Sequence, residues 1–147
     1  IKSAVDRGLK VCLNPAPMDS DVLSYPLDRI DILIVNRIEA GILSGRESEG
    51  EIMETLSGRF PGCETVLTLG AGGARAYSGG AVFAEQSPRV EVVDTTGAGD
   101  TFIGYYLAQR ARGAGIRDSL KMACRAASIS VTKAGAADSI PYIRQVS

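Results

Sequence analysis

Short apolar runs that alternate with helical patterns are the feature that most restricts how this chain can fold. Turn residues bound the runs at 10–14, 31–35 and 65–69, and each run has the length and composition of a strand. Residues 38–44 and 50–59, between the second and third runs, have helical patterns. Strands that alternate with helices build a parallel sheet that is covered on both faces. The sequence therefore predicts an α/β fold.

The second half of the chain begins with a different pattern. Residues 73–86 predict two short strands joined by Gly79 and Gly80, a pair typical of two-residue hairpin turns. Residues 90–94 predict one more strand, and a helix starts at about Gly97. Because this helix is apolar almost all round, we expect it to be buried rather than to lie on the surface. The prediction is one α/β domain with an inserted β-hairpin.

Composition and charge narrow the class of partner. The 147 residues are 45% hydrophobic and 22% charged, with a net charge of −1, so bulk charge does not favour nucleic-acid binding and small partners are expected. The chain has no histidine, so any proton transfer must use a carboxylate, lysine, tyrosine or cysteine. The same absence excludes catalytic triads and dyads that depend on imidazole.

Cysteine usage and hydropathy favour a cytoplasmic location. Cys12, Cys63 and Cys124 are widely spaced and odd in number, which favours reduced thiols over a disulfide framework or a zinc site. No apolar run approaches the roughly 18 residues that a membrane span needs, so no membrane partner is expected. The chain starts with Ile1 rather than methionine, and we expect it to be truncated or processed.

The stretch DTTGAGD, residues 94–100, places two glycines where a long helix is about to begin. Glycine in a helical turn costs roughly 1 kcal/mol relative to alanine, so we expect a function for the bare backbone. A helix N-terminus has unpaired N–H groups and a partial positive charge, and glycines there let a phosphate approach closely. Asp100, in the first turn, should stay ionised and could accept a proton from a hydroxyl beside that phosphate.

A structural interpretation of this stretch stays open. One of residues 94–96 can cap the helix while Asp100 complements the helix dipole, although this leaves the two glycines unexplained. Other phosphate-binding motifs fit less well. The chain contains no Gly-Lys pair for a Walker loop, and Arg75 takes the place of the third glycine of a dinucleotide fingerprint at 70–75.

Four motifs in register resemble those of one enzyme family. DTTGAGDTF is similar to the D-T-x-G-A-G-D signature of the PfkB (ribokinase-like) carbohydrate kinases, and LNPAP, NRIE and TLGAGG resemble that family's upstream motifs. Within the family, LNPAP and SVTKAGAADSIP are most similar to the ribokinase pattern. The resemblance covers essentially all 147 residues. It implies that residues 1–147 are the C-terminal, nucleotide-binding portion of a single ribokinase-like domain, with a Rossmann-like parallel sheet.

The resemblance implies ATP-dependent phosphorylation of a sugar hydroxyl. Asp100 matches the family's catalytic base, and Gly97, Ala98 and Gly99 match the anion hole whose N–H groups stabilise the transferring phosphoryl group. Phosphoryl transfer depends mainly on positioning and electrostatic stabilisation, which suits such a site. The implied partners are ATP and a small sugar, and the full-length protein could form a homodimer.

The resemblance also implies binding residues for the nucleotide and for two cations. Asn36 and Glu39 match an N-x-x-E motif that is associated with Mg²⁺ and the ATP phosphates. The remaining matches are the nucleotide loop of Thr68, Gly70 and Gly73, the position of an adenine-contacting residue at Cys124, and a loop for a monovalent cation such as K⁺ at Asp94 and Thr96.

Structural and functional alternatives remain at this point. Asn36 followed three residues later by Glu39 is also a capping box, and TLGAGG is also an ordinary passage from a strand into a turn. The chain contains no G-G-x-x-x-N sugar motif, so we expect the isolated chain to be poorly active. The alternative function is a non-catalytic module or remnant that binds ATP or ADP without transferring phosphate.

Overall fold

The computed structural model describes residues 1–146, and the chain divides into two compact units. The first unit comprises Ile1–Thr68 and Ala76–Val82, and the second comprises Leu69–Arg75 and the chain from Phe83 onward. No helix in the described range is long and apolar enough to cross a lipid bilayer.

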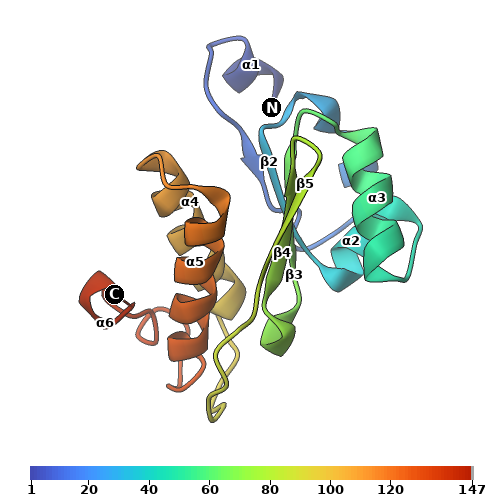
Figure 1. Cartoon of the computed structure of the whole chain (residues 1–147). Coiled ribbons are helices and arrows are strands. Elements are labelled where there is room, and N and C mark those ends of the chain that lie inside the picture. The colour runs from blue at the N-terminus through green and yellow to red at the C-terminus, as the bar shows by residue number, and fades with distance from the viewer. Residues whose placement is uncertain (147) are drawn as a thin grey trace. The chain divides into compact units, whose positions relative to one another are not determined.

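Three parallel strands form the centre of the first unit (Figure 1). β2 (Ile32–Asn36) lies between β1 (Cys12–Leu13) and β3 (Glu64–Thr68). The order of strands in the sheet is β1-β2-β3-β4-β5. The predicted α/β class with a parallel sheet is therefore confirmed. In the register, Asn36 pairs with Thr68, so two predicted site residues end neighbouring strands.

Helices follow β2 where the sequence predicts them. α2 (Arg37–Ser44) and α3 (Glu49–Arg59) each begin one residue before the predicted position. Both ends of α2 are specified locally, because a capping box closes its start and Gly45 adopts a left-handed conformation at its end. The shorter helical segments of this unit are α1 (Lys2–Val5) and two 3₁₀ turns, Ser20–Ser24 and Leu27–Arg29.

The core of the first unit is built on β2. Leu33, Ile34 and Val35 are 0%, 1% and 0% exposed, and consecutive strand residues point to opposite faces, so both faces of this strand are covered. Ile52 and Leu56 of α3 are also fully buried. Each such side chain contributes about 1.5–3 kcal/mol through removal of apolar surface from water.

The predicted hairpin is present, and its turn is formed by the predicted glycines. β4 (Ala74–Ser78) and β5 (Ala81–Glu85) are joined by Gly79 and Gly80, whose φ angles are 58° and 83°. Two consecutive positive φ angles are typical of the type I′ turn that joins two antiparallel strands. A 3₁₀ turn, Gly70–Gly72, precedes β4.

Two helices that pack against each other dominate the second unit (Figure 1). α4 (Ala98–Ala111) is followed by α5 (Ile116–Ser130), and the short α6 (Ile143–Val146) lies near the C-terminus. The prediction that α4 is buried rather than on the surface is wrong for part of the helix. Only Thr101, Phe102 and Tyr106 are buried, because the small residues of the helix, such as Gly104 and Ala108, face outward.

The predicted strand at residues 90–94 is also wrong. No strand is assigned between Glu85 and α4, and Val92 and Val93 are 58% and 62% exposed. The N–H groups of Val93 and Asp94 both donate to the carbonyl of Val131, at 2.8 and 3.2 Å. A strand ladder requires a succession of acceptors along a neighbour, so two donors that share one carbonyl bend the chain into α4 instead.

Candidate active site

The N-terminus of α4 is formed by the glycine-rich stretch. Gly97 is the N-cap, with φ 75° and ψ 3°, and no side chain caps the helix. The alternative in which a residue of 94–96 caps α4 with its side chain is therefore wrong. A Cβ on Gly97 would lie 3.3 Å from the Cα of Ala136, so both the conformation and the close neighbour favour glycine here.

Three backbone donors at this helix start lack protein acceptors. The N–H of Ala98 donates to the Thr95 carbonyl at 3.2 Å, and the N–H of Thr101 donates to the Gly97 carbonyl at 2.9 Å. Within residues 1–146, the N–H groups of Gly97, Gly99 and Asp100 have no such partner. Together with the helix dipole, these donors make a site for an anion.

Asp100 and Gly99 are both accessible at the same place. Asp100 is exposed in the first turn of α4, and its carboxylate forms no hydrogen bond or ion pair with the rest of the described chain. A Cβ on Gly99 would meet no atom within 4 Å, so open space lies over its backbone. The Asp100 carboxylate thus lies beside unpaired backbone N–H groups. Such a site can bind an anion next to a group that accepts a proton.

The loop before α4 is tied to the segment after α5 by Asp94. Its Oδ1 accepts from the N–H and the hydroxyl of Thr96, at 2.9 and 2.7 Å, and its Oδ2 accepts from the N–H of Gly135 at 2.9 Å. These hydrogen bonds, led by the one from the Thr96 backbone, lower the pKa of Asp94 from 3.8 to about 2. Asp94 therefore stays ionised, and within residues 1–146 no lysine or arginine neutralises it.

In the first unit, Asn36 and Glu39 form the capping box. The Asn36 side chain accepts from the Glu39 N–H at 2.9 Å, and Oε2 of Glu39 accepts from the Asn36 N–H at 2.9 Å. Glu39 is 6% exposed, and its Oε1 has no hydrogen-bond partner among the described residues. The structural alternative is thus real, and it leaves one carboxylate oxygen for a cation.

The predicted nucleotide loop behaves differently at each position. Thr68, half-buried at the end of β3, donates its hydroxyl to the Val35 carbonyl at 3.4 Å, and Gly70 is exposed. Gly73, with φ 89°, is buried, and a Cβ there would lie 2.1 Å from the carbonyl oxygen of Glu85. Gly73 is required by this close approach of two backbone segments, which is a structural reason independent of any phosphate.

Cys124 is buried in α5 and lies near a residue that the sequence reasoning missed. Burial, followed by the nearby negative charge of Glu85, raises the pKa of the Cys124 thiol from 9.0 to about 12. Glu85 ends β5 and also lies over Gly73. One signal could have found it, because Phe83 and Glu85 alternate with exposed residues, a period of two that turns both toward the protein.

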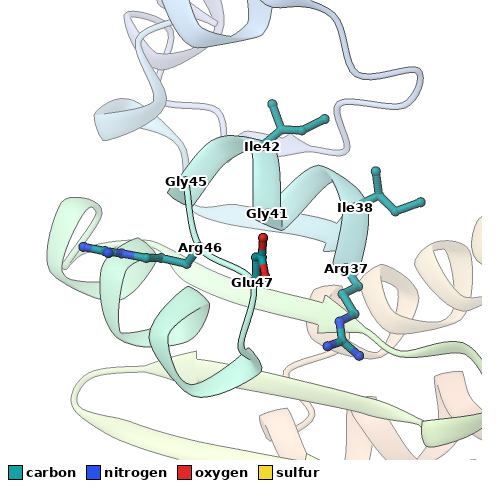
Figure 2. A pocket seen from close by; sticks show the side chains of 7 residues that line it. All are labelled: Arg37, Ile38, Gly41, Ile42, Gly45, Arg46 and Glu47. Atoms are coloured by element: carbon teal, nitrogen blue, oxygen red, sulfur yellow. The ribbon is translucent and has the colours of Figure 1, made fainter.

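A hollow of about 550 Å³ on α2 lies outside this set of residues. Its lining comes from α2 and the turn that follows, and Figure 2 shows the isoleucine side chains projecting from the helix: Arg37, Ile38, Gly41, Ile42, Gly45, Arg46 and Glu47. None of these is a predicted site residue. Among residues 1–146 there is also no cluster of three or more histidine, cysteine or acidic side chains that could hold a metal ion without help from a ligand.

Comparison with known proteins identifies the class. The profile described as pfkB family carbohydrate kinase matches residues 2–143, so the chain belongs to that family. Among its relatives, the ribokinase of Haemophilus influenzae is 39% identical over 143 residues, covering 94% of this chain and 46% of that protein. The chain spans about half the length of the curated relatives it matches.

Solved structures of ribokinases share the fold. The structure of Arabidopsis thaliana ribokinase complexed with ribose and ATP is 30% identical, with a TM-score of 0.89 over 99% of this chain and 48% of that chain. An E. coli protein assigned as a ribokinase II, in complex with ATP and Mg²⁺, is 25% identical, with a TM-score of 0.85 over 99% of this chain and 49% of that chain. The predicted ribokinase-like fold, as a partial domain, is therefore confirmed.

Proposed function

We propose that this chain is the nucleotide-binding portion of a kinase that transfers the γ-phosphate of ATP to a sugar hydroxyl. The observation that carries the proposal is the start of α4, where three unpaired N–H groups and the exposed Asp100 carboxylate lie together. Membership of the pfkB carbohydrate kinase family supports the reaction class. The relatives complexed with ATP support the nucleotide.

In this proposal, each group at the helix start has one role. The N–H groups of Gly97, Gly99 and Asp100 bind the phosphoryl group and stabilise its charge during transfer. Ala98 is one of the three residues of the predicted anion hole, together with Gly97 and Gly99, but its N–H already donates to the Thr95 carbonyl, so its contribution is positional. Asp100 accepts the proton of the attacking hydroxyl, because its exposed carboxylate lies in the first turn of the helix beside these N–H groups.

The proposed role of Glu39 is that of a magnesium ligand. Mg²⁺ is usually held by one or two carboxylates together with substrate phosphates and water, and the free Oε1 of Glu39 fits that pattern. When bound, Mg²⁺ would neutralise charge on the nucleotide phosphates. Asn36 orients Glu39 through the capping box, and Thr68 ends the neighbouring strand.

Further assignments in the second unit concern the nucleoside and a monovalent cation. Gly70 and Gly73 would place their loop beside ATP, and Cys124 would lie at the edge of the base. The ionised Asp94, with the backbone of Thr96, offers oxygen atoms to a cation such as K⁺. Three hydrogen bonds already hold this carboxylate in place, so its geometry does not depend on the ion.

Replacement of Asp100 by asparagine tests the catalytic assignment. In the full-length protein, with ATP, Mg²⁺ and ribose, we expect Asp100→Asn to lower kcat at least about 100-fold, because a general base contributes roughly that much, while ATP affinity changes little. ADP formation and calorimetric titration measure the two effects. Unchanged turnover in the variant would refute the assignment of the base.

The same experiment addresses the second candidate function. Because the chain covers about half of its relatives' length, binding of ATP or ADP without transfer is the alternative. A full-length wild type that binds ATP in calorimetry but forms no ADP with ribose would favour this non-catalytic module. Phosphorylation of ribose by the wild type would exclude it.

A further inference from the structure

Glu85 is a charged residue of the second unit that the functions above do not use. It ends β5, it is half-buried, and its carboxylate forms no hydrogen bond or ion pair with residues 1–146. A charged group that has lost part of its water without gaining a partner is costly, and a bound ligand can supply the missing hydrogen bond.

Two neighbours fix the position of Glu85. Its carbonyl oxygen lies against the backbone of Gly73, so close that a Cβ there would be 2.1 Å away. Its negative charge also acts on the thiol of Cys124 in α5. The backbone of Glu85 therefore lies against the loop of residues 70–73, and its charge lies near Cys124 in the middle of α5; all three belong to the second unit.

We propose that the Glu85 carboxylate accepts a hydrogen bond from the nucleoside part of the bound nucleotide. This inference rests on the proposed function, which places the loop of residues 70–73 and Cys124 beside ATP. Carboxylates at the ends of strands bind ribose hydroxyls in dinucleotide sites, and the exocyclic amine of adenine is the other available donor. The phosphates are excluded as partners, because they are negatively charged acceptors.

Removal of the Glu85 carboxylate should change ATP affinity in a direction that shows whether the carboxylate binds the nucleoside or only lies near ATP. A carboxylate that only lies near ATP repels its phosphates, so its removal should strengthen binding. A carboxylate that accepts a hydrogen bond from the nucleoside should weaken binding when it is removed. A merely structural role would change the affinity for all nucleotides by the same factor.

Calorimetric titration of the chain with Mg²⁺ and a set of nucleotides tests the proposal. For ATP, we expect Glu85→Ala to bind about tenfold more weakly than the wild type, the factor typical of a lost hydrogen bond to a charged group. The probes 2′-deoxy-ATP, 3′-deoxy-ATP and the triphosphate of purine riboside, which lacks the 6-amino group, identify the donor. The analogue without the relevant donor should bind the wild type about tenfold more weakly than ATP does, and Glu85→Ala should not distinguish it from ATP.

A matched control is available in the same segment. Glu91 is an exposed carboxylate six residues along the chain, so Glu91→Ala removes the same charge and should leave ATP affinity within about twofold. Equal or tighter ATP binding by Glu85→Ala, or an equal loss for every nucleotide, would overturn the inference. A wild type that binds the nucleotides but none more weakly than ATP would also overturn it. If the wild type binds no nucleotide at all, the proposed function fails as well.

Discussion

At the scale of single residues, Gly99 separates folding from function most directly. It lies in α4 without a positive φ, and a Cβ there meets no atom within 4 Å, so Gly99→Ala should stabilise the helix by up to about 1 kcal/mol. The same methyl group would occupy the space that a phosphate needs above the backbone. We therefore expect a higher Tm together with ATP binding at least about tenfold weaker, measured by thermal denaturation and calorimetry.

Gly104 is the matched control for this variant. It lies in the same helix, is exposed, and also has no atom within 4 Å of an added Cβ. Gly104→Ala should raise the Tm by a similar amount and leave ATP affinity unchanged. Similar losses of affinity in both variants would show that helix stiffness, rather than access to the backbone, determines binding.

The lowered pKa of Asp94 predicts that the structure of its loop depends on pH. A carboxylate whose pKa is lowered by folding stabilises the native state above its unfolded pKa of 3.8 and loses this contribution as the pH falls toward about 2. The amide resonance of Gly135, which donates to this carboxylate, should therefore be constant near neutral pH and shift with a midpoint near 2. NMR titration measures the shift, and a midpoint near 3.8 would show that the hydrogen bonds do not hold in solution.

At the scale of elements, α2 combines a structural and a functional role in Glu39. Glutamine can replace glutamate at the third position of a capping box, so Glu39→Gln should keep the start of α2 and the Tm nearly unchanged. The neutral side chain should nevertheless bind Mg²⁺ less well, so the Mg²⁺ requirement for ATP binding should rise several-fold. In contrast, Asn36→Ala removes the cap and should cost about 1 kcal/mol.

Chemical denaturation and ATP titration at several Mg²⁺ concentrations measure the two effects of these variants separately. If Glu39→Gln lowered stability as much as Asn36→Ala and left the Mg²⁺ dependence unchanged, Glu39 would be a capping residue only. The sequence cannot separate these roles, because the same two residue types satisfy the requirements of both.

Elements that depend on local signals could be predicted from the sequence, and elements that depend on distant partners could not. The run DILIV and the pair Gly79–Gly80 carry their structure in adjacent residues, and both were predicted correctly. Residues 90–94 have the composition of a strand, but the acceptor for Val93 and Asp94 is Val131, distant in sequence. No local pattern shows that one carbonyl takes both donors.

The candidate site follows the same rule. The motif at 94–100 predicts the helix start, because its two glycines and the acidic residue of the first turn are adjacent in the sequence. Gly73 contacts the backbone of Glu85, and the charge of Glu85 acts on Cys124, so three separate segments are involved. No spacing of residues in the sequence predicts these two contacts. Residues whose function depends on such contacts can be identified only from the folded structure.

At the scale of the whole molecule, the three thiols provide probes of both units: Cys63 and Cys124 are buried, and Cys12 is partly buried. Cys12 and Cys63 lie in the first unit and Cys124 in the second, and all three are free. Desolvation is the largest cause that raises the pKa of each thiol, to about 11, 11 and 12 in that order. A thiol whose pKa is raised by folding stabilises the native state fully below pH 9.0, and this contribution is lost as the pH rises through 11.

The urea midpoint should therefore be steady from pH 7 to about 9 and fall between pH 9 and 11. In Cys63→Ala the fall should be smaller, because one of the titrating groups is gone. Alkylation by iodoacetamide at pH 8 gives an independent measure, since the thiolate reacts. A rise of the pKa from 9.0 to about 11 makes the thiolate about 100-fold rarer at Cys12 and Cys63, and the rise to about 12 makes it rarer still at Cys124. Mass spectrometry should find all three cysteines modified slowly in the native protein and rapidly in urea. Rapid native modification of Cys124 would show that α5 opens readily, which would contradict the tight packing of α4 against α5 that fixes the proposed site.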